Sequence, residues 1–466
     1  MNPQVDLYQA VAGLLVCTVF ILWWTMRSQN PGVGLLLGYW FQFLQNYGIA
    51  GVMHTLPWTN SPYAAETVLG FPEAVLSLSI LCIGAWLTHV VLLRLPGAGE
   101  ATPTEAPIRW ATPKHIFIMG VVMGYLLAPL INRIPSGTAV SSTLASLTVA
   151  AWGILVYRAI QTRSLVFVAV LLMGTVIFPL STVLQSGFLG FGAGSVILIV
   201  SLAAVYLRPQ LLTIALGVMV LYVGMSVYLT YMRDRIDIRD SVWGGESLDA
   251  RATVVLDTFT RFEWFDPDSE VHFQRVDTRM NQNYLFGAAM IRLQRGEVDY
   301  WHGETLLVAM VAAIPRFLWP DKPTSAGSGN LVSELTGMQF TSGTSVGIGP
   351  VMEFYANFGR VGMVIASLVM GGFLGLCDVR AGTALRAGHT TRYAAWMLLG
   401  IPLHQALGSL ISISSSLATA LVLYILFRRF WERRGPVPTQ AGPSPVGGTN
   451  GLSGEQASPT GLAPSS

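Results

Sequence analysis

The chain has 466 residues, of which 52% are hydrophobic and 11% are charged, with a formal net charge of +2 and a mean hydropathy of +0.54. Soluble globular domains carry roughly 25% charged residues, so this composition excludes that class and indicates an integral membrane protein. No long basic run supports nucleic-acid binding. The three cysteines form no CxxC pair, so neither a zinc site nor a redox pair is indicated.

Apolar stretches of the length of a membrane span recur along the chain. They fall near residues 8–25, 32–53, 74–95, 115–134, 138–157, 165–185, 188–207, 210–231, 349–376, 393–411 and 413–430. A transmembrane helix needs roughly 20 apolar residues, and a bilayer leaves no backbone polar group unpaired. We therefore expect an all-α fold, a polytopic transmembrane helix bundle of about 11–12 spans.

The positions of arginine and lysine set the expected orientation. Arg27, Arg94, Arg158 and Arg208 follow the first, third, fifth and seventh stretches. If these connections are cytoplasmic, the N-terminus and the segment after residue 231 are external, and the C-terminal tail is cytoplasmic. The arginine positions in the C-terminal part of the chain agree with this orientation if residues 304–319 do not cross the membrane. These residues form only a short apolar stretch, which we interpret as a re-entrant or interfacial helix. If they do cross, the arginines of 377–392 lie outside.

Four regions follow from this pattern. Residues 1–231 form an N-terminal bundle of about 8 spans, 232–348 a large external loop, 349–434 a C-terminal bundle of about 3 spans, and 435–466 a Gly-, Pro- and Ser-rich tail that we expect to be disordered. Residues 232–303 hold 13 of the 25 acidic side chains. Within them we expect an amphipathic helix capped by Ser247 and running to Phe262. A second should run from about Thr278 to Arg295 and stop at Gly296.

The clearest polar cluster lies on the ninth stretch. Glu353, Asn357 and Arg360 are spaced i, i+4 and i+7, which places them on one face of a continuous helix. Ionisable groups within a span are costly and mark functional sites by default. The alternative is a Glu–Arg pair that only stabilises the start of the helix.

Two further features suit a phosphorylated ligand at a membrane surface. Pro350 begins this helix after the run TSGTSVGIGP (341–350), whose exposed N–H groups could bind an anion or simply form a flexible loop. Arg316 and Lys322 lie in the turn IPRFLWPDKP (314–323). Such cations could grip a diphosphate, or could instead reach lipid headgroups.

Residues 275–375 contain, in this order, an Arg-x-x-x-Asn element (Arg279 to Asn283), IPRFLWPDKP, a Thr/Ser/Gly run, and GPVMEFYANFGRVG (349–362). This order resembles that of the bacterial oligosaccharide repeat-unit polymerases of the O-antigen polymerase type. It implies a GT-C-like membrane glycosyltransferase at the outer face of the bacterial cytoplasmic membrane. Such an enzyme polymerises undecaprenyl-diphosphate-linked oligosaccharide into a surface or exopolysaccharide, without a metal or other cofactor.

The resemblance also implies roles for individual residues. Glu353 is the first candidate for the catalytic base and His302 the second. The candidates for binding the diphosphate or glycan are Arg279, Asn283, Arg316, Lys322, Asn357 and Arg360. Membrane lipids are expected partners, together with a chain-length regulator and a flippase of the same pathway.

Other functions stay open. An O-antigen ligase-type transferase would have the same large external loop. A lipid-oligosaccharide flippase or transporter would favour internal repeats and charges spread along a central path, whereas here the charges gather in one loop. A scaffold of an export complex would need no polar face at residues 353–360.

Overall fold

The computed structural model describes residues 3–27, 31–56, 61–94, 111–133, 137–163, 165–207, 211–314, 319, 328–340 and 346–431. Over these residues the protein is all-α, with no strand, which confirms the expected fold class at this level. The contacts divide the chain into Met1–Tyr424 and Ile425–Ser466, and the second unit is described only over the last turns of one helix. The expected tail 435–466 lies outside the described residues.

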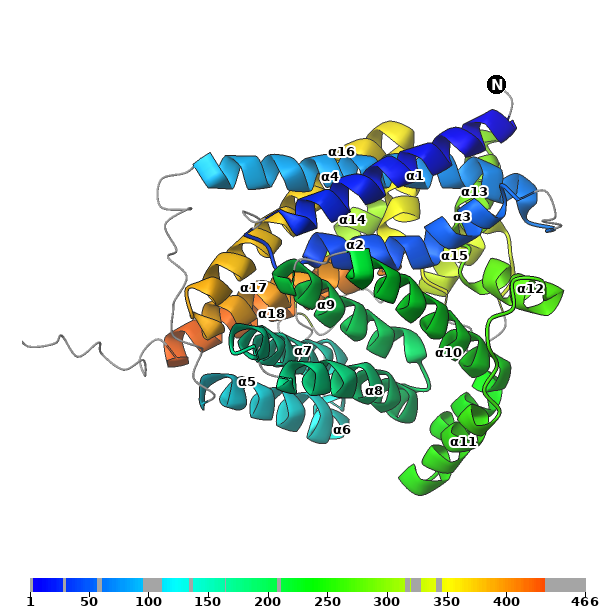
Figure 1. Ribbon diagram of the computed structural model, residues 1–466. Helices are drawn as coiled ribbons and strands as arrows, with labels where there is room; N and C mark the ends of the chain where they lie inside the picture. Colours follow the sequence, from blue (N-terminus) through cyan, green and yellow to red (C-terminus); the bar gives the residue numbers. More distant parts are fainter. Residues whose placement is uncertain are drawn as a thin grey trace, which may run out of the picture. The chain divides into compact units, whose positions relative to one another are not determined.

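The first unit contains a succession of helices and two π-helical turns (Figure 1). They are α1 (Pro3–Met26), α2 (Leu35–Phe43), η1 (Leu44–Gly48), α3 (Ile49–Met53), α4 (Ala64–Arg94), α5 (Ala111–Val121), η2 (Val122–Leu126), α6 (Ala128–Ile131), α7 (Gly137–Gln161), α8 (Val166–Ser186), α9 (Leu189–Leu207) and α10 (Leu211–Trp243). They continue with α11 (Leu248–Thr260), α12 (Glu270–Arg279), α13 (Gln282–Gln294), α14 (Glu304–Ala312), α15 (Ser328–Thr336), α16 (Gly349–Arg386), α17 (Thr390–Leu403) and the start of α18 (Leu410–Trp431).

Five of the described helical segments are long and apolar enough to cross a membrane. By length and composition they are Val5–Met26, Ala64–Leu92, Ala139–Gln161, Val168–Ser186 and Gly349–Arg386. Three shorter apolar helices are Lys114–Leu126, Gly192–Leu207 and Leu410–Leu426. The described residues thus support a membrane protein with fewer full-length spans than the 11–12 expected. The stretch 32–53 is one reason, because it is divided among α2, η1 and α3.

Three of the long helices run side by side in the same direction. Cys17 Sγ lies 3.2 Å from Ser79 Oγ, and the rings of Trp24 and His89 lie 4.2 Å apart, so α1 and α4 are parallel. A Cβ on Gly84 would lie 2.2 Å from the Leu368 carbonyl oxygen, and one on Gly371 would lie 2.1 Å from that of Leu81. Such close backbone approach is typical of membrane helices that pack through small residues.

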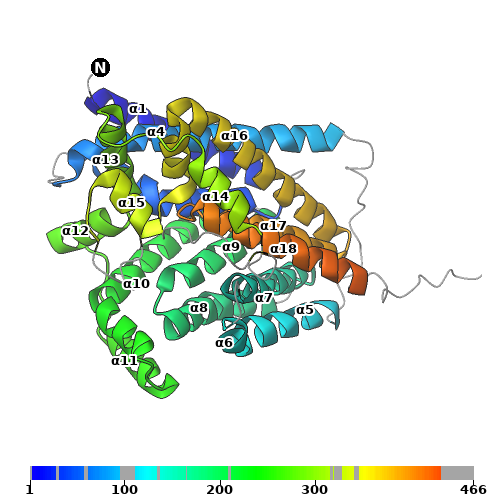
Figure 2. The ribbon, with the colours of Figure 1, turned by 180° about the vertical axis from the view of Figure 1, so that it is seen from behind.

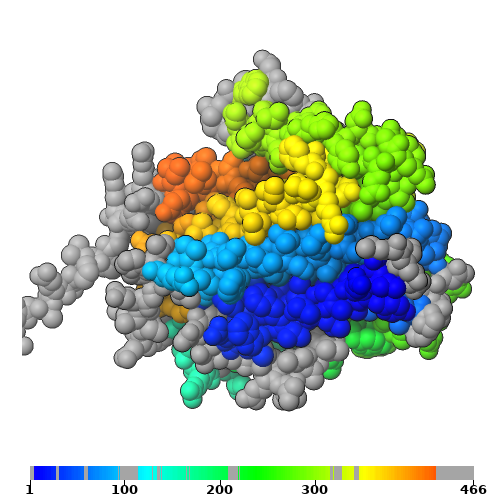
Figure 3. Space-filling model, turned by 90° about the horizontal axis from the view of Figure 1, so that it is seen from above, coloured from blue at the N-terminus to red at the C-terminus, as the bar shows by residue number. Residues whose placement is uncertain are grey.

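Ser77 Oγ lies 2.7 Å from Ser367 Oγ, and a Cβ on Gly375 would lie 2.8 Å from Ala85 Cα, so α4 and α16 are parallel too. Figure 3 shows α1, α4 and α16 as adjacent dark-blue, light-blue and yellow bands. The C-terminal ends of α1, α4 and α16 lie in a positively charged region. Arg27 and Arg386 both act electrostatically on His89, which lies near the end of α4. Helices α3, α12 and α13 lie toward the opposite end, near the N-terminus of α1 (Figure 1).

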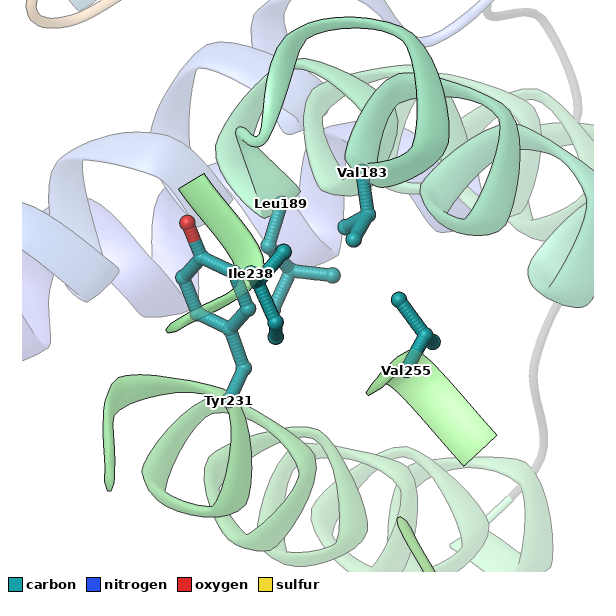
Figure 4. Packing of buried hydrophobic residues seen from close by; sticks show 5 residues of the cluster. All are labelled: Val183, Leu189, Tyr231, Ile238 and Val255. Carbon is teal, nitrogen blue, oxygen red and sulfur yellow. The ribbon is translucent and has the colours of Figure 1, made fainter. Parts of the chain in front are cut away.

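The segment expected to be an external loop is largely helical, and part of it lies inside the bundle. Helix α10 continues past residue 231 to Trp243. It turns back into α11, which Ser247 caps as expected by accepting a hydrogen bond from the Ala250 N–H. Val183, Leu189, Tyr231, Ile238 and Val255 form the buried cluster that joins α10 and α11 to α8 and α9 (Figure 4).

Helix α13 corrects the expectation of a surface amphipathic helix in this segment. The predicted helix from Thr278 to Arg295 is broken into α12 and α13, and Asn281 caps the second by accepting a hydrogen bond from the Asn283 N–H. Residues 282–290 are all buried. A Cβ on Gly287 would lie 1.9 Å from the Glu66 carbonyl oxygen, so α13 packs directly on α4. Helices α13, α14 and α15 gather around the beginning of α16 (Figure 2).

Candidate functional site

The three residues predicted to share a helix face are separated by a break in α16. Phe358 and Gly359 have non-helical backbone angles, and Gly359 has φ +67° and ψ −160°, a conformation open essentially to glycine alone. Glu353 and Asn357 before the break are fully buried, whereas the Arg360 side chain is 65% exposed and pairs with Glu73 on α4 at 3.2 Å. The expectation of one polar face was therefore wrong, because it assumed an unbroken helix.

The break is stabilised by the turn that leads into α14. The carbonyl oxygens of Ala356 and Asn357, which the broken helix cannot use, accept hydrogen bonds from the N–H groups of Trp301 at 2.9 Å and His302 at 3.1 Å. The Asn357 side-chain oxygen accepts a third from the Gly303 N–H at 3.0 Å. His302 has φ +47° and an exposed side chain. Its backbone N–H thus bonds to α16, while the residue as a whole is exposed.

Glu353 is directed at the beginning of α18. Its Oε2 accepts a hydrogen bond from the Leu410 N–H at 2.8 Å, a favourable place for a carboxylate because helix N-termini carry partial positive charge. Its Oε1 is buried, and the Thr305 hydroxyl on α14 is close enough to act on the carboxylate. Asn357 Nδ2 donates to Thr305 Oγ1 and to the Glu353 carbonyl oxygen, both at 2.7 Å. Glu353 and Asn357 thus tie together α14, α16 and α18.

Two of the other predicted site residues, Arg279 and Asn283, lie at the corner where α12 meets α13. The remaining two lie outside the described residues. Asn283 is fully buried, and its Nδ2 donates to the Tyr47 carbonyl oxygen at 2.8 Å, within the π-helical turn η1. Arg279 ends α12 and is exposed. Arg316 and Lys322 lie outside the described residues.

A buried His–Asp pair at the same corner was missed from the sequence. His54 Nε2 and Asp277 Oδ1 lie 2.7 Å apart, Asn281 Nδ2 donates to the same oxygen at 2.8 Å, and the Ser61 hydroxyl donates to Asp277 Oδ2. Asn281 also donates to Thr67 Oγ1 at 2.9 Å, which fixes the corner to the first turns of α4. A histidine at the end of an apolar stretch was the available signal, although its acidic partner lies 223 positions away.

Three arginines at the junction of α10 and α12 form a second unpredicted feature. Arg235 and Arg239 lie one turn apart on α10, and Arg279 ends α12. Burial and the neighbouring guanidinium groups of Arg279 and Arg239 lower the pKa of Arg235. Within the described part of the chain, none of the three has a carboxylate at ion-pair distance. We call Arg235, Arg239 and Arg279 the arginine cluster.

Nearby arginines outside this cluster are neutralised. Arg233 Nη1 lies 2.8 Å from Glu263 Oε1, and Arg275 Nη1 lies 3.0 Å from Glu263 Oε2. In the cluster, Arg239 instead stacks over the Phe188 ring at 4.4 Å. Concentrated positive charge without a carboxylate suits a ligand with several negative charges. Among the described residues, no three His, Cys, Asp or Glu side chains gather in a metal-binding arrangement.

The Asp277 carboxylate should make stability depend on acid pH. Burial raises the pKa of Asp277, but hydrogen bonds from His54, Ser61 and Asn281 outweigh burial and hold this pKa below its ordinary 3.8. The stabilisation is therefore fully present above the ordinary value and lost as pH falls below 3.8. We expect Asp277→Asn to lower the unfolding temperature in detergent at pH 6, and the difference from wild type to narrow below pH 3.8. A difference independent of pH would contradict this assignment.

Residues 100–385 match the family described as a domain of unknown function, DUF8712. The match covers more than half of the chain, so the protein belongs to this family. Neither the curated proteins nor the solved structures include a match to the chain.

Proposed function

We propose that the protein is a bacterial membrane glycosyltransferase that polymerises lipid-diphosphate-linked oligosaccharide repeat units at the outer face of the cytoplasmic membrane. The arginine cluster carries the proposal. A diphosphate bears several negative charges, and its departure as a leaving group is favoured by preorganised cations in a partly dehydrated site. Arg235, Arg239 and Arg279 offer three such cations without a competing carboxylate among the described residues.

The position of the cluster supports an external reaction. Asn281, two positions after Arg279, contacts Thr67 in the first turns of α4, whereas Arg27 and Arg386 lie near its far end. Positive residues that flank spans favour the cytoplasmic side, so the end that holds Arg27 and Arg386 is the cytoplasmic one in this proposal. The cluster then faces outward.

The predicted roles are adjusted accordingly. Arg279 remains a diphosphate ligand and gains Arg235 and Arg239, whereas Arg360 is already paired with Glu73. Asn283 and Asn357 position the elements around the site. We do not route the proton through Glu353, because its Oε2 already accepts a hydrogen bond from the Leu410 N–H and no arginine of the cluster is among the described groups that act on it. A chain-length regulator and a flippase of the same pathway are the proposed partners.

The test compares charge removal inside and outside the cluster. We expect the double substitution Arg235→Ala with Arg279→Ala to lower the yield of polymer by about 100-fold or more, because each cation stabilises the leaving group. Arg295→Ala is the matched control, since Arg295 is 70% exposed and only near Glu297. Polymer length and lipid-linked repeat units would be measured on reconstituted protein.

The products distinguish the alternatives. Unchanged polymer in the double variant would contradict the proposal. Transfer of a finished glycan to a different acceptor, with no elongation, would favour the ligase. Movement of the lipid-linked oligosaccharide across the bilayer without new glycosidic bonds would favour the flippase.

A further inference from the structure

The pair His54–Asp277 has the construction of an oriented base. Asp277 is 3% exposed, and both of its oxygens accept hydrogen bonds, so the carboxylate cannot turn away from the imidazole. His54 Nε2 faces Asp277 Oδ1 at 2.7 Å. A carboxylate that accepts from one imidazole nitrogen fixes the tautomer in which the other nitrogen carries the lone pair. In His54 that other nitrogen is Nδ1, which makes no hydrogen bond to a described residue.

The surroundings of the pair hold the imidazole in place and limit its contact with bulk water. The His54 side chain is 1% exposed, and its ring lies 6.4 Å from that of Phe273 on α12. Met53, next to it in the chain, packs with Val276 and Met280 of α12 and with Met225 of α10. Exclusion of water protects a glycosyl donor from hydrolysis, which a polymerase must avoid.

One member of the arginine cluster, Arg279, lies on the same helix as Asp277. Asp277 precedes Arg279 by two positions on α12, and both act electrostatically on the Tyr284 hydroxyl of α13. Tyr63, before α4, stacks on Tyr284 with ring centroids 4.4 Å apart. Tyr228 on α10 also lies within the electrostatic reach of Arg279. An oriented base and a set of unpaired cations are the two parts that displacement of a diphosphate requires.

Resting on the proposed function, we propose that His54, oriented by Asp277, accepts the proton of the attacking hydroxyl. The acceptor sugar's oxygen forms a bond to the anomeric carbon of the donor, and the bond from that carbon to the diphosphate oxygen breaks. The proton passes to His54 Nδ1, and the diphosphate leaves with the electron pair, held by the arginine cluster. The imidazolium then returns the proton to solvent.

The two candidate bases predicted from the sequence are His302 and Glu353. Each of them lacks either an orienting carboxylate or a nearby arginine of the cluster. His302 is exposed and has no carboxylate within ion-pair distance among the described residues. Glu353 accepts a hydrogen bond from the start of α18, and no arginine of the cluster is among the described groups that act on it. Of these three candidates, His54 is the one with an orienting carboxylate, and this carboxylate lies on the helix that carries Arg279.

The experiment separates proton transfer from folding and from binding. His54→Gln retains a side-chain N–H that can donate to Asp277, so we expect it to fold normally but to lower the rate of glycan transfer about 100-fold or more. His115→Gln, at an exposed position on α5, is the matched control and should leave the rate unchanged. Binding of undecaprenyl diphosphate to His54→Gln should stay within threefold of wild type. Added imidazole should restore part of the activity of His54→Ala, a rescue that a purely structural role would not give.

Each outcome decides between the two proposals. Transfer by His54→Gln within threefold of wild type would overturn the role of His54, and so would a loss of undecaprenyl diphosphate binding that matches the loss of rate. If Arg279→Ala is inactive while His54→Gln is active, the proposed function stands and only this inference fails. If the wild-type protein elongates no lipid-linked glycan, the proposed function fails and the role of His54 fails with it.

Discussion

Gly287→Ala should prevent normal assembly of the membrane bundle, although it adds a single methyl group. A Cβ at this position would lie 1.9 Å from the Glu66 carbonyl oxygen, a backbone atom that cannot rotate away. The facing Gly70 is equally constrained, because its Cβ would lie 2.1 Å from the Asn283 carbonyl oxygen. Helices α4 and α13 must therefore move apart, at a cost on the order of 3 kcal/mol or more.

The measurement is the fraction of monodisperse protein after detergent extraction, together with its unfolding temperature. Gly224→Ala is the matched control, since Gly224 lies within α10 and a Cβ there would meet no atom within 4 Å. Because alanine favours helices over glycine, this variant should be as stable as wild type or slightly more stable. Equal stability of the two alanine variants would contradict the close packing of α4 and α13.

Asp378→Ala should be the most damaging substitution at the other end of the bundle. One carboxyl oxygen, Oδ1, accepts hydrogen bonds from the backbone N–H groups of Val33, Gly34 and Leu35 at 2.8–2.9 Å. These amides begin α2 and lie in a buried region, so removal of the acceptor leaves them without a partner. We expect a loss of roughly 3–5 kcal/mol in the free energy of unfolding, measured by denaturant titration in detergent.

Asp378→Asn is the informative comparison, because the amide oxygen can still accept from these N–H groups. Its loss should be clearly smaller than that of the alanine variant. A neighbouring contact shows how narrow the space is: a Cβ on Gly34, which has φ +95°, would lie 2.7 Å from the Ser201 carbonyl oxygen. If alanine and asparagine at position 378 cost the same, the three hydrogen bonds do not stabilise the start of α2.

Local signals in the sequence predicted local structure well. Ser247 caps α11, Gly296 follows α13 with φ +68°, and Pro350 lies in the first turn of α16. Each depends on the backbone preferences of one residue and its near neighbours, which the sequence contains directly. The short helix expected within 304–319 is likewise present as α14 (Glu304–Ala312).

Long-range packing explains the failures. The periodicity of residues 353–360 assumed a continuous helix, but the turn at 301–303 supplies the hydrogen bonds that make a break at Gly359 stable. Arg360 consequently pairs with Glu73 instead of facing Glu353. The polar composition of residues 232–303 suggested an external cap. Helix α13 within this segment is buried instead, because Gly70 and Gly287 allow the backbones of α4 and α13 to come into contact.

By itself, the sequence determined that this is a helical membrane protein, because apolar content and the pairing of backbone groups in lipid leave few alternatives. It also pointed to the segment after residue 231 as the place where polar chemistry gathers. Only the tertiary structure decided which groups meet there. His54 and Asp277 are 223 positions apart, and a hydrogen bond at that separation leaves no local pattern that spacing along the chain could reveal. The arginine cluster, too, exists only because α10 and α12 fold against each other.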